Sequence, residues 1–413
     1  MTSDVPRSSS SYPFVLISLV TLNFGLVFFD RNALSYLMPF IQPQLGLSNT
    51  DIGALNSGFA CSWAVAGLGV GWLSDWLGRR KILLVASAIV FSAASLLSGL
   101  ATTFLLLFGA RLLMGIAEGG VMPLSQALVA AEVPPERRGL AMGAAQNFGA
   151  NLLGTFLAPI VLVAFAQAYG WRAAFFLAAL PGFLVAFLMA RYIREHPVSK
   201  AASGAAAAPP IGATLGERNV WVCIILSMLV VSFLVVFISF MPLYLVNTRH
   251  LDKVTMSWLM AMWGLPSVGY AFLVPGSSDF LGRKPVAIAM SAVAALIPLS
   301  ALFIDGPVWP LFVLFGLGAS ISGIYPIVMA TIPAETVPAP QFGTVLGLTM
   351  GLGAAVGGIF SPVLAGMLGD AQGLRAVLWI LVAISAMCVM FACALRETAP
   401  VALKRRSIAV ASS

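Results

Sequence analysis

Two charged residues, Arg111 and Glu118, lie inside the apolar stretch 104–130, which is long enough to cross a bilayer. An Arg, Lys or Asp at the centre of a membrane helix costs roughly 2.5 to 3.5 kcal/mol, so such residues usually mark a functional site. A spacing of seven residues is about two helical turns and places both side chains on the same side of a helix, about 10 Å apart along its axis. The pair therefore predicts a polar site within the membrane.

A second pair, Asp30 and Arg31, lies deep in the apolar stretch 14–37. If this helix begins near residue 12, a rise of about 1.5 Å per residue carries Asp30 about 24 Å across the membrane. The same rise places Arg111 about 10 Å below the opposite surface, and these depths are close in a hydrocarbon core of about 30 Å. We therefore predict that Asp30 and Arg111 come within ion-pair reach, with Glu118 nearer the middle.

These residue types suit the coupled binding of a carboxylate and a proton. A guanidinium offers a planar fork of donors and keeps its charge, so we expect Arg31 and Arg111 to bind a substrate carboxylate. Burial favours a neutral carboxyl whereas a nearby Arg favours the anion, so Asp30 and Glu118 are candidates to carry coupling protons. The alternative is that the four charges only neutralise one another within a helical bundle. We favour the functional interpretation because charges inside membranes are usually functional.

The composition is typical of a membrane protein with many spans, because 60% of the residues are hydrophobic and 9% are charged. The net charge of +7 does not indicate a nucleic-acid partner, because the basic residues lie in short clusters between apolar segments. The four cysteines include no CxxC pair and there are only two histidines, so we predict neither a disulfide framework nor a metal site. The absence of HExxH and GxSxG motifs argues against an enzyme, and no cofactor is expected.

Twelve apolar segments of about 20 residues or more predict an all-α membrane protein with twelve transmembrane helices in two six-helix bundles. The segments are 14–37, 51–74, 81–100, 104–131, 139–168, 172–193, 219–247, 255–277, 285–304, 308–333, 342–369 and 374–395. They form an N-terminal bundle over 14–193 and a C-terminal bundle over 219–395. The Ala/Gly/Pro-rich stretch 194–218 is typical of a linker between the two bundles.

Basic residues indicate the orientation. If both termini are cytoplasmic, sixteen of the 22 Lys and Arg residues lie on the cytoplasmic side and four on the outside, with Arg31 and Arg111 on neither side. The positive-inside rule therefore predicts a cytoplasmic N-terminal tail over 1–13, a cytoplasmic linker and a cytoplasmic C-terminal tail over 396–413.

The two halves repeat each other. The motif GWLSDWLGRRK at 71–81 returns as GSSDFLGRKP at 276–285, which aligns Asp75 with Asp279. A register shorter by one residue aligns later residues of the first half, including Pro123, Glu132, Pro135, Pro159 and Arg172, with Pro326, Glu335, Pro338, Pro362 and Arg375 of the second half. A duplicated six-helix unit is typical of a transporter whose bundles rock around a site near the membrane midplane.

With these motifs the sequence resembles the major facilitator superfamily over essentially its whole length, because the 71–81 motif is similar to that family's signature loop between helices 2 and 3. Within the superfamily it is most similar to the anion:cation symporter family, through DRNALS (30–35), RLLMGIAEGGVMP (111–123) and GWRAAFF (170–176). The resemblance implies a monomeric importer of small organic anions in the inner membrane, driven by a proton or sodium gradient. Protons are the expected partner, because we find no cluster of neutral oxygen ligands for sodium.

The resemblance also implies a conformational latch at one end of the bundles. Its residues would be Asp75, Arg79 and Arg80 in the first copy of the motif, and Asp279 and Arg283 in the second. An acid near a helix N-terminus is favoured by the helix dipole. The alternative is that the basic residues only set the topology, but the repeated Asp is more than topology needs.

Three further residues are candidates for substrate contact. Gln146 belongs to a polar stripe in 139–168, and Trp263 and Tyr325 are aromatic residues of the second half. Tyr325 precedes Pro326, where we expect a local break in the helix. The alternatives are hydrogen bonding between helices for Gln146, and packing or interfacial roles for the aromatic residues.

The residues leave two transport functions open. The stretch 343–358 contains no Asn or Gln, which favours a less polar carboxylate over a heavily hydroxylated sugar acid. The alternative function is drug or metabolite efflux by proton antiport on the same fold. Against it, GANLLGTFLAP at 149–159 lacks a GPxxGG-type antiporter signature, and paired Arg residues suit anions better than lipophilic cations.

Overall fold

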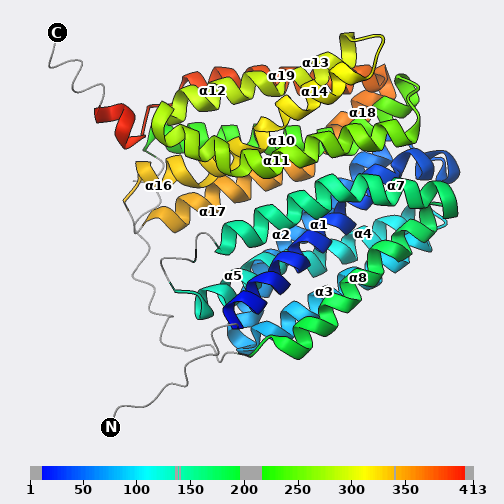
Figure 1. Ribbon diagram of the computed structural model, residues 1–413, viewed down its shortest axis with the longest axis horizontal. Helices are drawn as coiled ribbons and strands as arrows, with labels where there is room; N and C mark the ends of the chain where they lie inside the picture. Colours follow the sequence, from blue (N-terminus) through cyan, green and yellow to red (C-terminus); the bar gives the residue numbers. More distant parts are fainter. Residues whose placement is uncertain (1–11, 135–137, 139–140, 196–215, 339–340, 405–413) are drawn as a thin grey trace.

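The computed structural model describes residues 12–134, 138, 141–195, 216–338 and 341–404, and the regular structure of these residues is helical (Figure 1). The first half contains α1 (Tyr12–Leu45), α2 (Asn49–Leu77), α3 (Arg80–Gly99), α4 (Phe104–Gly119), α5 (Val121–Glu132), the π-helices η1 (Ala144–Phe148) and η2 (Ala150–Leu157), α7 (Ala158–Tyr169) and α8 (Trp171–Tyr192). The second half begins with α10 (Arg218–Leu243), η4 (Tyr244–Thr248), α11 (Lys253–Leu281), α12 (Arg283–Ala294), α13 (Leu296–Phe303) and α14 (Trp309–Gly318). It continues with η5 (Ala319–Gly323), α15 (Ile324–Pro326), η6 (Ile327–Thr331), α16 (Ile332–Thr336), α17 (Phe342–Gly353), η8 (Ala354–Phe360), α18 (Ser361–Gln372) and α19 (Leu374–Cys393).

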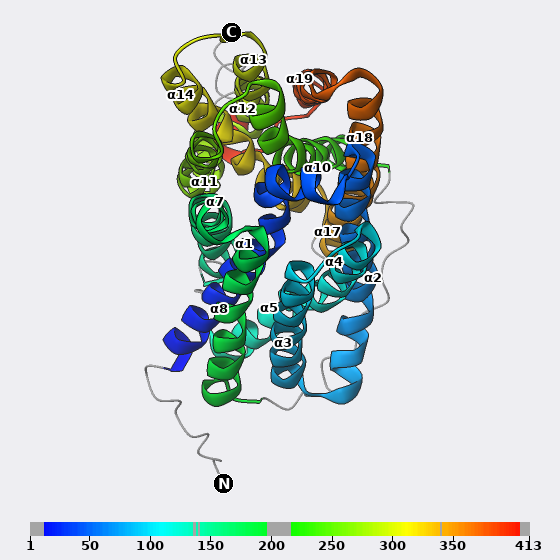
Figure 2. The ribbon, with the colours of Figure 1, turned by 90° about the vertical axis from the view of Figure 1, so that its right-hand side faces the viewer.

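The two halves form two helical bundles that lie side by side. Figure 1 shows the first half below the second. Figure 2, viewed from the right-hand side of Figure 1, shows the same division into two bundles. Along the boundary, α1 packs against α10, α7 packs against α11, and α2 packs against α18. The predicted two-bundle, all-helical fold is therefore confirmed.

The predicted membrane segments agree with the helices to within a few residues in most cases. In the described residues, eleven helical segments are long and apolar enough to cross a membrane. The remaining predicted segment, 51–74, corresponds to α2, which is 29 residues long. Most of the predicted linker, 194–218, lies outside the described residues.

The largest difference is the end of the first helix, which was expected at residue 37 but extends to Leu45. Two prolines, Pro39 and Pro43, lie inside this extension. Proline removes a backbone hydrogen bond and usually ends a helix. Met38 and Ile41 are fully buried there, so apolar packing offsets the lost hydrogen bonds.

The structure also contains breaks in helices. The predicted segment 308–333 is divided into short pieces, and the three-residue α15, with Tyr325 and Pro326, lies between the 3₁₀-helix η5 and the π-helix η6. The expected break at Tyr325 is therefore confirmed. The predicted segment 139–168 contains the π-helices η1 and η2, and such π turns are frequent at functional sites.

The two ends of the molecule differ in how the halves meet. One end, here called the tail face, holds the first residues of α1 and α10 and the last residues of α8 and α19 (Figure 1, left). The opposite end, here called the far face, holds the connections from α1 to α2 and from α18 to α19. In the part of the chain that the structure describes, the side-chain hydrogen bonds between halves all lie at the far face.

The main contact at the far face is a helix cap supplied by the other half. The Asp370 carboxylate of α18 accepts hydrogen bonds from the N–H groups of Asn49 and Thr50, each at 2.8 Å, and from the Thr50 hydroxyl at 2.6 Å. Asn49 and Thr50 begin α2, where N–H groups have no partner within the helix and the dipole favours an anion. Asn247 adds a hydrogen bond to Gln42 at 3.1 Å.

Candidate functional site

Arg31 of α1 and Glu118 of α4 form an ion pair inside the first bundle. Arg31 Nη2 lies 2.7 Å from Glu118 Oε2, and Arg31 Nε donates to the same oxygen at 2.8 Å. The Glu118 side chain is fully buried, whereas that of Arg31 is 22% exposed. Glu118 Oε1 has no hydrogen-bond partner among the described residues. Arg31 therefore faces the buried acid on one side and accessible space on the other.

Aromatic rings surround the Arg31 guanidinium. Its central carbon lies 4.6 Å from the ring centroid of Phe28, 4.8 Å from that of Phe59 and 5.9 Å from that of Trp63. Rings in this position attract a cation and exclude water, which strengthens electrostatic interactions at the site. The guanidinium is thus held by its surroundings before any ligand arrives.

Arg111 lies behind this pair. It is only 1% exposed, its guanidinium carbon is 4.8 Å from the Phe59 centroid, and its Nη2 donates to the Arg31 carbonyl oxygen at 3.3 Å. Arg111 and Glu118 both approach Arg31, so the prediction that they share one side of their helix is confirmed. In this conformation only Arg31, of the two arginines, presents its guanidinium to accessible space.

Asp30 and Arg111, which were predicted to come within ion-pair reach, form no ion pair in this structure, although their charges lie within electrostatic range of each other. Asp30 Oδ1 instead accepts a hydrogen bond from the Ser95 hydroxyl of α3 at 2.6 Å, and the described residues form no ion pair with Asp30. The reason is angular, because neighbouring residues on a helix point about 100° apart. Arg31 points toward α4, so Asp30 points toward α3. The prediction compared only the depths of Asp30 and Arg111 in the membrane, and depth does not tell which neighbouring helix a side chain faces.

The other predicted contact residues lie at different distances from the ion pair. Tyr325 is 36% exposed and lies within electrostatic range of Arg31 across the two halves. Trp263 is buried, its ring packs 5.0 Å from that of Phe237, and its indole N–H has no hydrogen-bond partner among the described residues. Of these two aromatic residues, only Tyr325 therefore combines exposure with electrostatic range of Arg31.

Gln146 lies apart from the ion pair. It is partly buried in η1, where it lines a narrow crevice with Phe24 of α1 and Ser125 of α5. Phe24 precedes Arg31 by about two helical turns, so the crevice lies about 10 Å nearer the tail face.

The predicted latch residues of the second half form a network within that half. Arg283 Nη2 lies 2.6 Å from Asp279 Oδ1 and 2.8 Å from Glu335 Oε1, which ties α12 to α11 and α16. These contacts do not cross to the first half in this conformation. The Asp75 side chain lies outside the described residues, and Arg79 is exposed at the start of α3.

Two residues missed by the sequence analysis repeat between the halves. Glu195 accepts hydrogen bonds from the N–H groups of Lys81 and Ile82 at the start of α3, at 3.1 and 3.4 Å. Glu397 accepts from the N–H groups of Arg283 and Lys284 at the start of α12, at 2.8 and 3.2 Å. Each acid follows an Arg just after the last helix of its half, so the Arg-Glu repeat was a usable signal. Ser95, Phe59 and Asp370 were also missed and carry no comparable signal.

Within the described residues, no three His, Cys, Asp or Glu side chains gather in a way that could hold a metal ion. The Arg31 site itself offers a buried carboxylate paired with a guanidinium. Such a site can bind an anion and exchange a proton.

The family model of the Major Facilitator Superfamily matches residues 20–354 and 278–410, which together cover most of the sequence. This chain belongs to the Major Facilitator Superfamily. Membership agrees with the fold, with the multi-pass membrane architecture and with the resemblance seen in the loop motif.

Curated relatives of this chain carry two kinds of name, transporters of organic compounds and multidrug resistance proteins. The probable sulfoacetate transporter SauU of Cupriavidus necator is 28% identical over 253 residues, which covers 58% of this chain and 58% of that protein. The hexuronate transporter of Bacillus subtilis is 30% identical over 271 residues, 62% of each chain. The multidrug resistance protein MdtG of a Rahnella species is 27% identical over 315 residues, 73% of this chain and 75% of that protein. The matches to the first two thus span about three fifths of those relatives.

Solved structures of Major Facilitator Superfamily proteins share the fold. A bacterial homologue of the human lysosomal transporter Spinster, in an inward-facing and unoccupied conformation, superposes with a TM-score of 0.79 at 18% identity and covers 93% of this chain and 97% of that one. A D-xylose–proton symporter superposes with a TM-score of 0.73 at 19% identity, covering 92% and 97%.

Proposed function

We propose that this protein is a secondary active transporter that imports an organic carboxylate by symport with protons. The observation that carries the proposal is the ion pair between the buried Glu118 and the partly exposed Arg31. A transported carboxylate can reach Arg31 from the accessible side, whereas Glu118 holds it from the buried side. The two acids therefore compete for one guanidinium.

This competition links substrate binding to proton binding. When the substrate carboxylate binds Arg31, Glu118 loses its closest cation in a dry site, and this favours the protonated form of the acid. Arg111 stays behind the site as a fixed positive charge that favours an anion over a cation. Asp30, held by Ser95, is the proposed second proton carrier.

The far-face contacts give the proposed transport cycle its starting state. The positive-inside rule favours a cytoplasmic tail face, and with this orientation closure at the far face by Asp370 and Asn247 corresponds to a state closed to the outside. Substrate would leave toward the cytoplasm from this state. Return to the outward-open state requires the contacts between Asp370 and α2 to break. We propose that the protein acts as a monomer in the inner membrane, with the two bundles rocking around Arg31 and Tyr325.

The site supports a carboxylate with an apolar body. Phe28, Phe59 and Trp63 surround the guanidinium, and Tyr325 of the other half lies within electrostatic range of it. The names of two relatives, for sulfoacetate and for hexuronate, support an organic anion in general. The aromatic surroundings favour a substrate with fewer hydroxyl groups than a sugar acid.

The second candidate is efflux by proton antiport, favoured by the relatives named multidrug resistance protein MdtG. In that case the Glu118 carboxylate would release a proton when a lipophilic cation binds. Two guanidiniums at the site argue against this, because they repel a cation.

Transport by purified protein in proteoliposomes tests the two candidates. Thermal-shift screening against glucuronate, sulfoacetate and benzoate selects a binding acid, and uptake of that acid is then measured with an acidic exterior. We expect accumulation that a protonophore abolishes, and no counterflow of a cationic dye such as ethidium. Counterflow of the dye without transport of any acid in the panel would support efflux and reject the symport proposal.

A further inference from the structure

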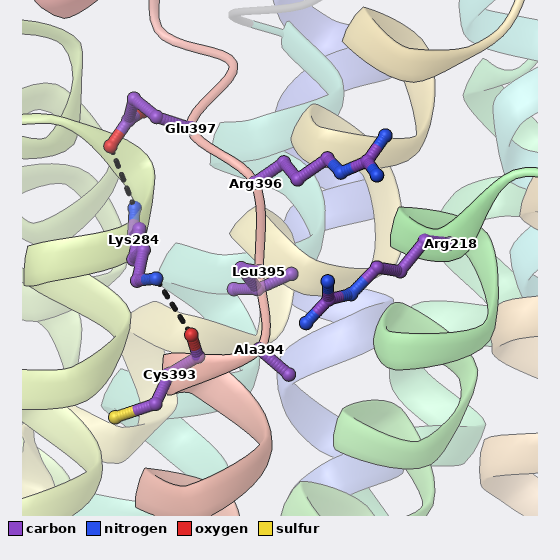
Figure 3. A pocket seen from close by; sticks show the side chains of 7 residues that line it. All are labelled: Arg218, Lys284, Cys393, Ala394, Leu395, Arg396 and Glu397. Carbon is purple, nitrogen blue, oxygen red and sulfur yellow. Dashed lines mark hydrogen bonds between the residues drawn. The ribbon is translucent and has the colours of Figure 1, made fainter.

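A cavity of about 350 Å³ opens at the tail face of the second half, away from the transport site (Figure 3). Its walls carry three cations, Arg218, Lys284 and Arg396, and one acid, Glu397. Figure 3 shows the side chains of Arg218 and Arg396 on the same side of the segment that follows α19, with Lys284 across that segment. A concave surface with this excess of positive charge is suited to an anion.

Within the described residues, the acid in the cavity forms no ion pair with the guanidiniums of Arg218 and Arg396. Glu397 accepts hydrogen bonds from the N–H groups of Arg283, Lys284 and Ala399, at 2.8, 3.2 and 2.9 Å. Its charge therefore stabilises the start of α12, where the helix dipole favours an anion. The Lys284 ammonium group donates to the carbonyl oxygen of Cys393 at 2.6 Å, which fixes the end of α19.

A buried amide fixes the backbone that carries Arg396. The side chain of Asn219, which is 5% exposed, accepts from the Arg396 N–H at 2.9 Å and donates to the Arg396 carbonyl oxygen at 3.1 Å. Asn219 follows Arg218 directly, so one short stretch of α10 holds the Arg396 backbone and also supplies the second guanidinium. The two cations are thus brought together by a built scaffold.

The internal repeat shows what is different about this end of the second half. Arg194 occupies the equivalent position in the first half, where its N–H donates to the Tyr12 hydroxyl at 2.8 Å and its guanidinium lies 4.5 Å from the Tyr12 ring centroid. In the second half, Asn219 replaces Tyr12 as the hydrogen-bond acceptor and offers no ring. The guanidiniums of Arg396 and Arg218 have no hydrogen-bond or ion-pair partner among the described residues.

The cavity lies at the ends of two helices that are long and apolar enough to cross a membrane, which is where lipid headgroups are expected. It is lined by the first residue of α10 and by the last residue of α19, both of which belong to apolar segments long enough to cross a membrane. Trp221, about one turn into α10, is 48% exposed, and exposed Trp is enriched at membrane interfaces. Basic cavities between helices at the cytoplasmic side are suited to anionic headgroups, and a guanidinium fork matches a phosphate.

We propose that Arg218 and Arg396 bind the phosphate group of an anionic phospholipid in this cavity, with Lys284 adding to the positive charge. The site is independent of the proposed transport function, because it shares no residue with the Arg31 site. A phosphate held there would neutralise the two adjacent cations and link α10 to the end of α19.

The test is lipid binding to the purified full-length protein, measured by native mass spectrometry and by thermal shift. Detergent-solubilised protein is titrated with phosphatidylglycerol, with phosphatidylcholine and with inorganic phosphate. The variants are Arg218→Gln combined with Arg396→Gln, the charge-preserving Arg396→Lys, and Arg194→Gln as the matched control from the first half. We expect phosphatidylglycerol to bind wild type in preference to the other two probes, and the double variant to bind it about 30-fold more weakly.

The controls separate this site from general membrane charge. Arg194→Gln should keep wild-type affinity, and Arg396→Lys should lie between wild type and the double variant because it keeps the charge but loses the fork. Equal affinity of wild type and double variant would overturn the proposal, as would an equal loss in Arg194→Gln. Binding of inorganic phosphate as tight as that of phosphatidylglycerol would show that a soluble phosphate, rather than a lipid, is the occupant. An unchanged unfolding temperature of the lipid-free double variant shows that its loss of binding does not come from misfolding.

Discussion

At the scale of single residues, Arg31 is the group on which the proposed function depends. Its guanidinium makes a short ion pair with Glu118, lies against aromatic rings and still has 22% of its side chain exposed. A guanidinium can hold one carboxylate while a second approaches, because its donors form a planar fork. A lysine at this position would supply the charge without that geometry.

Replacement of Arg31 should therefore weaken substrate binding even when the charge is kept. We expect Arg31→Gln to lower the affinity for the transported acid by about 100-fold, since hydrogen bonds between charged groups contribute about 1.5–3 kcal/mol each. Arg31→Lys should give a smaller loss. Binding is measured by thermal shift or calorimetry with the acid selected above. Arg191→Gln, an exposed arginine against Tyr192, is the matched control and should bind normally. Normal binding by Arg31→Gln would contradict this role.

Ser95 should stabilise the fold through Asp30. Ser95→Ala leaves the buried Asp30 Oδ1 without its hydrogen bond, and an unsatisfied buried acceptor costs about 1–3 kcal/mol. Ser98→Ala is the control, because Ser98 bonds only to the Ala94 carbonyl oxygen of its own helix. We expect a clear fall in Tm in detergent for Ser95→Ala and a smaller one for Ser98→Ala. Equal Tm values for the two variants would show that the bond to Asp30 adds nothing.

The sequence was sufficient to find all four charges of the site but not their pairing. Apolar context and cost of burial identify Asp30, Arg31, Arg111 and Glu118, because a charge in lipid is informative by itself. Pairing depends on the rotation of α1 relative to α3 and α4. That rotation is set by packing over the whole bundle, and helical depth carries no information about it.

At the scale of elements, the contact between α18 and α2 decides which end of the molecule is closed. Asp370 binds the N–H groups that begin α2, so one carboxylate joins the halves and completes a helix end. Close approach of the two helices needs glycine, since a Cβ on Gly53 would collide with the carbonyl oxygen of Pro362 and one on Gly366 with that of Asn49. The far face is thus closed by a specific contact.

Asp370→Ala should open the far face more often. The loss of three hydrogen bonds removes the link from the other half, while the capping box of Ser48 and Asp51 remains, so the amides of Asn49 and Thr50 should exchange hydrogen for deuterium faster in peptides covering residues 46–56. Asp305→Ala is the control, because Asp305 is also an acid of the far face but its side chain is 90% exposed. Unchanged exchange in Asp370→Ala, or an equal increase in both variants, would show that the cap does not hold this end closed.

Asp252 allows a prediction about pH. It precedes α11 and accepts hydrogen bonds from the N–H groups of Val254 and Thr255, at 3.0 and 2.9 Å. The hydrogen bond from the Thr255 hydroxyl is the main reason that the pKa of Asp252 lies below its ordinary value. A lowered pKa stabilises the folded state above the unfolded pKa, and this contribution is lost as pH falls through the folded pKa. Asp252→Ala should therefore lower Tm at pH 7, with a difference from wild type that shrinks below about pH 4. A difference independent of pH would contradict the cap.

The positions of the helices along the chain could be predicted from the sequence better than the irregularities within each helix. Long apolar runs locate eleven spans and α2, because a membrane requires a minimum length of apolar helix. The π-helices in 144–157 and the continuation of α1 past Pro39 depend on how neighbouring helices pack. Local sequence preferences alone do not determine them.

At the scale of the whole molecule, the proposal requires the tail face to lie in the cytoplasm. Cys393 tests this directly, since it is exposed at the tail-face end of α19. In a variant with Cys61, Cys223 and Cys388 changed to Ser, a membrane-impermeant maleimide should label Cys393 in inverted vesicles but not in right-side-out vesicles. A cysteine introduced at Asp305, on the far face, should give the opposite pattern. Labelling of Cys393 from the outside would show that the tail face lies outside the cell, and would contradict the proposed orientation.

At this scale, the proposed coupling of proton transport to substrate transport depends on the competition between Glu118 and the substrate for Arg31. The most direct measurement is uphill transport by Glu118→Gln in proteoliposomes with an acidic exterior, using the acid that wild type accumulates. We predict that the variant still exchanges this acid in counterflow but no longer concentrates it, because the buried proton-binding carboxylate is gone. If Glu118→Gln concentrates the acid to the same level as wild type, the proposed mechanism is wrong.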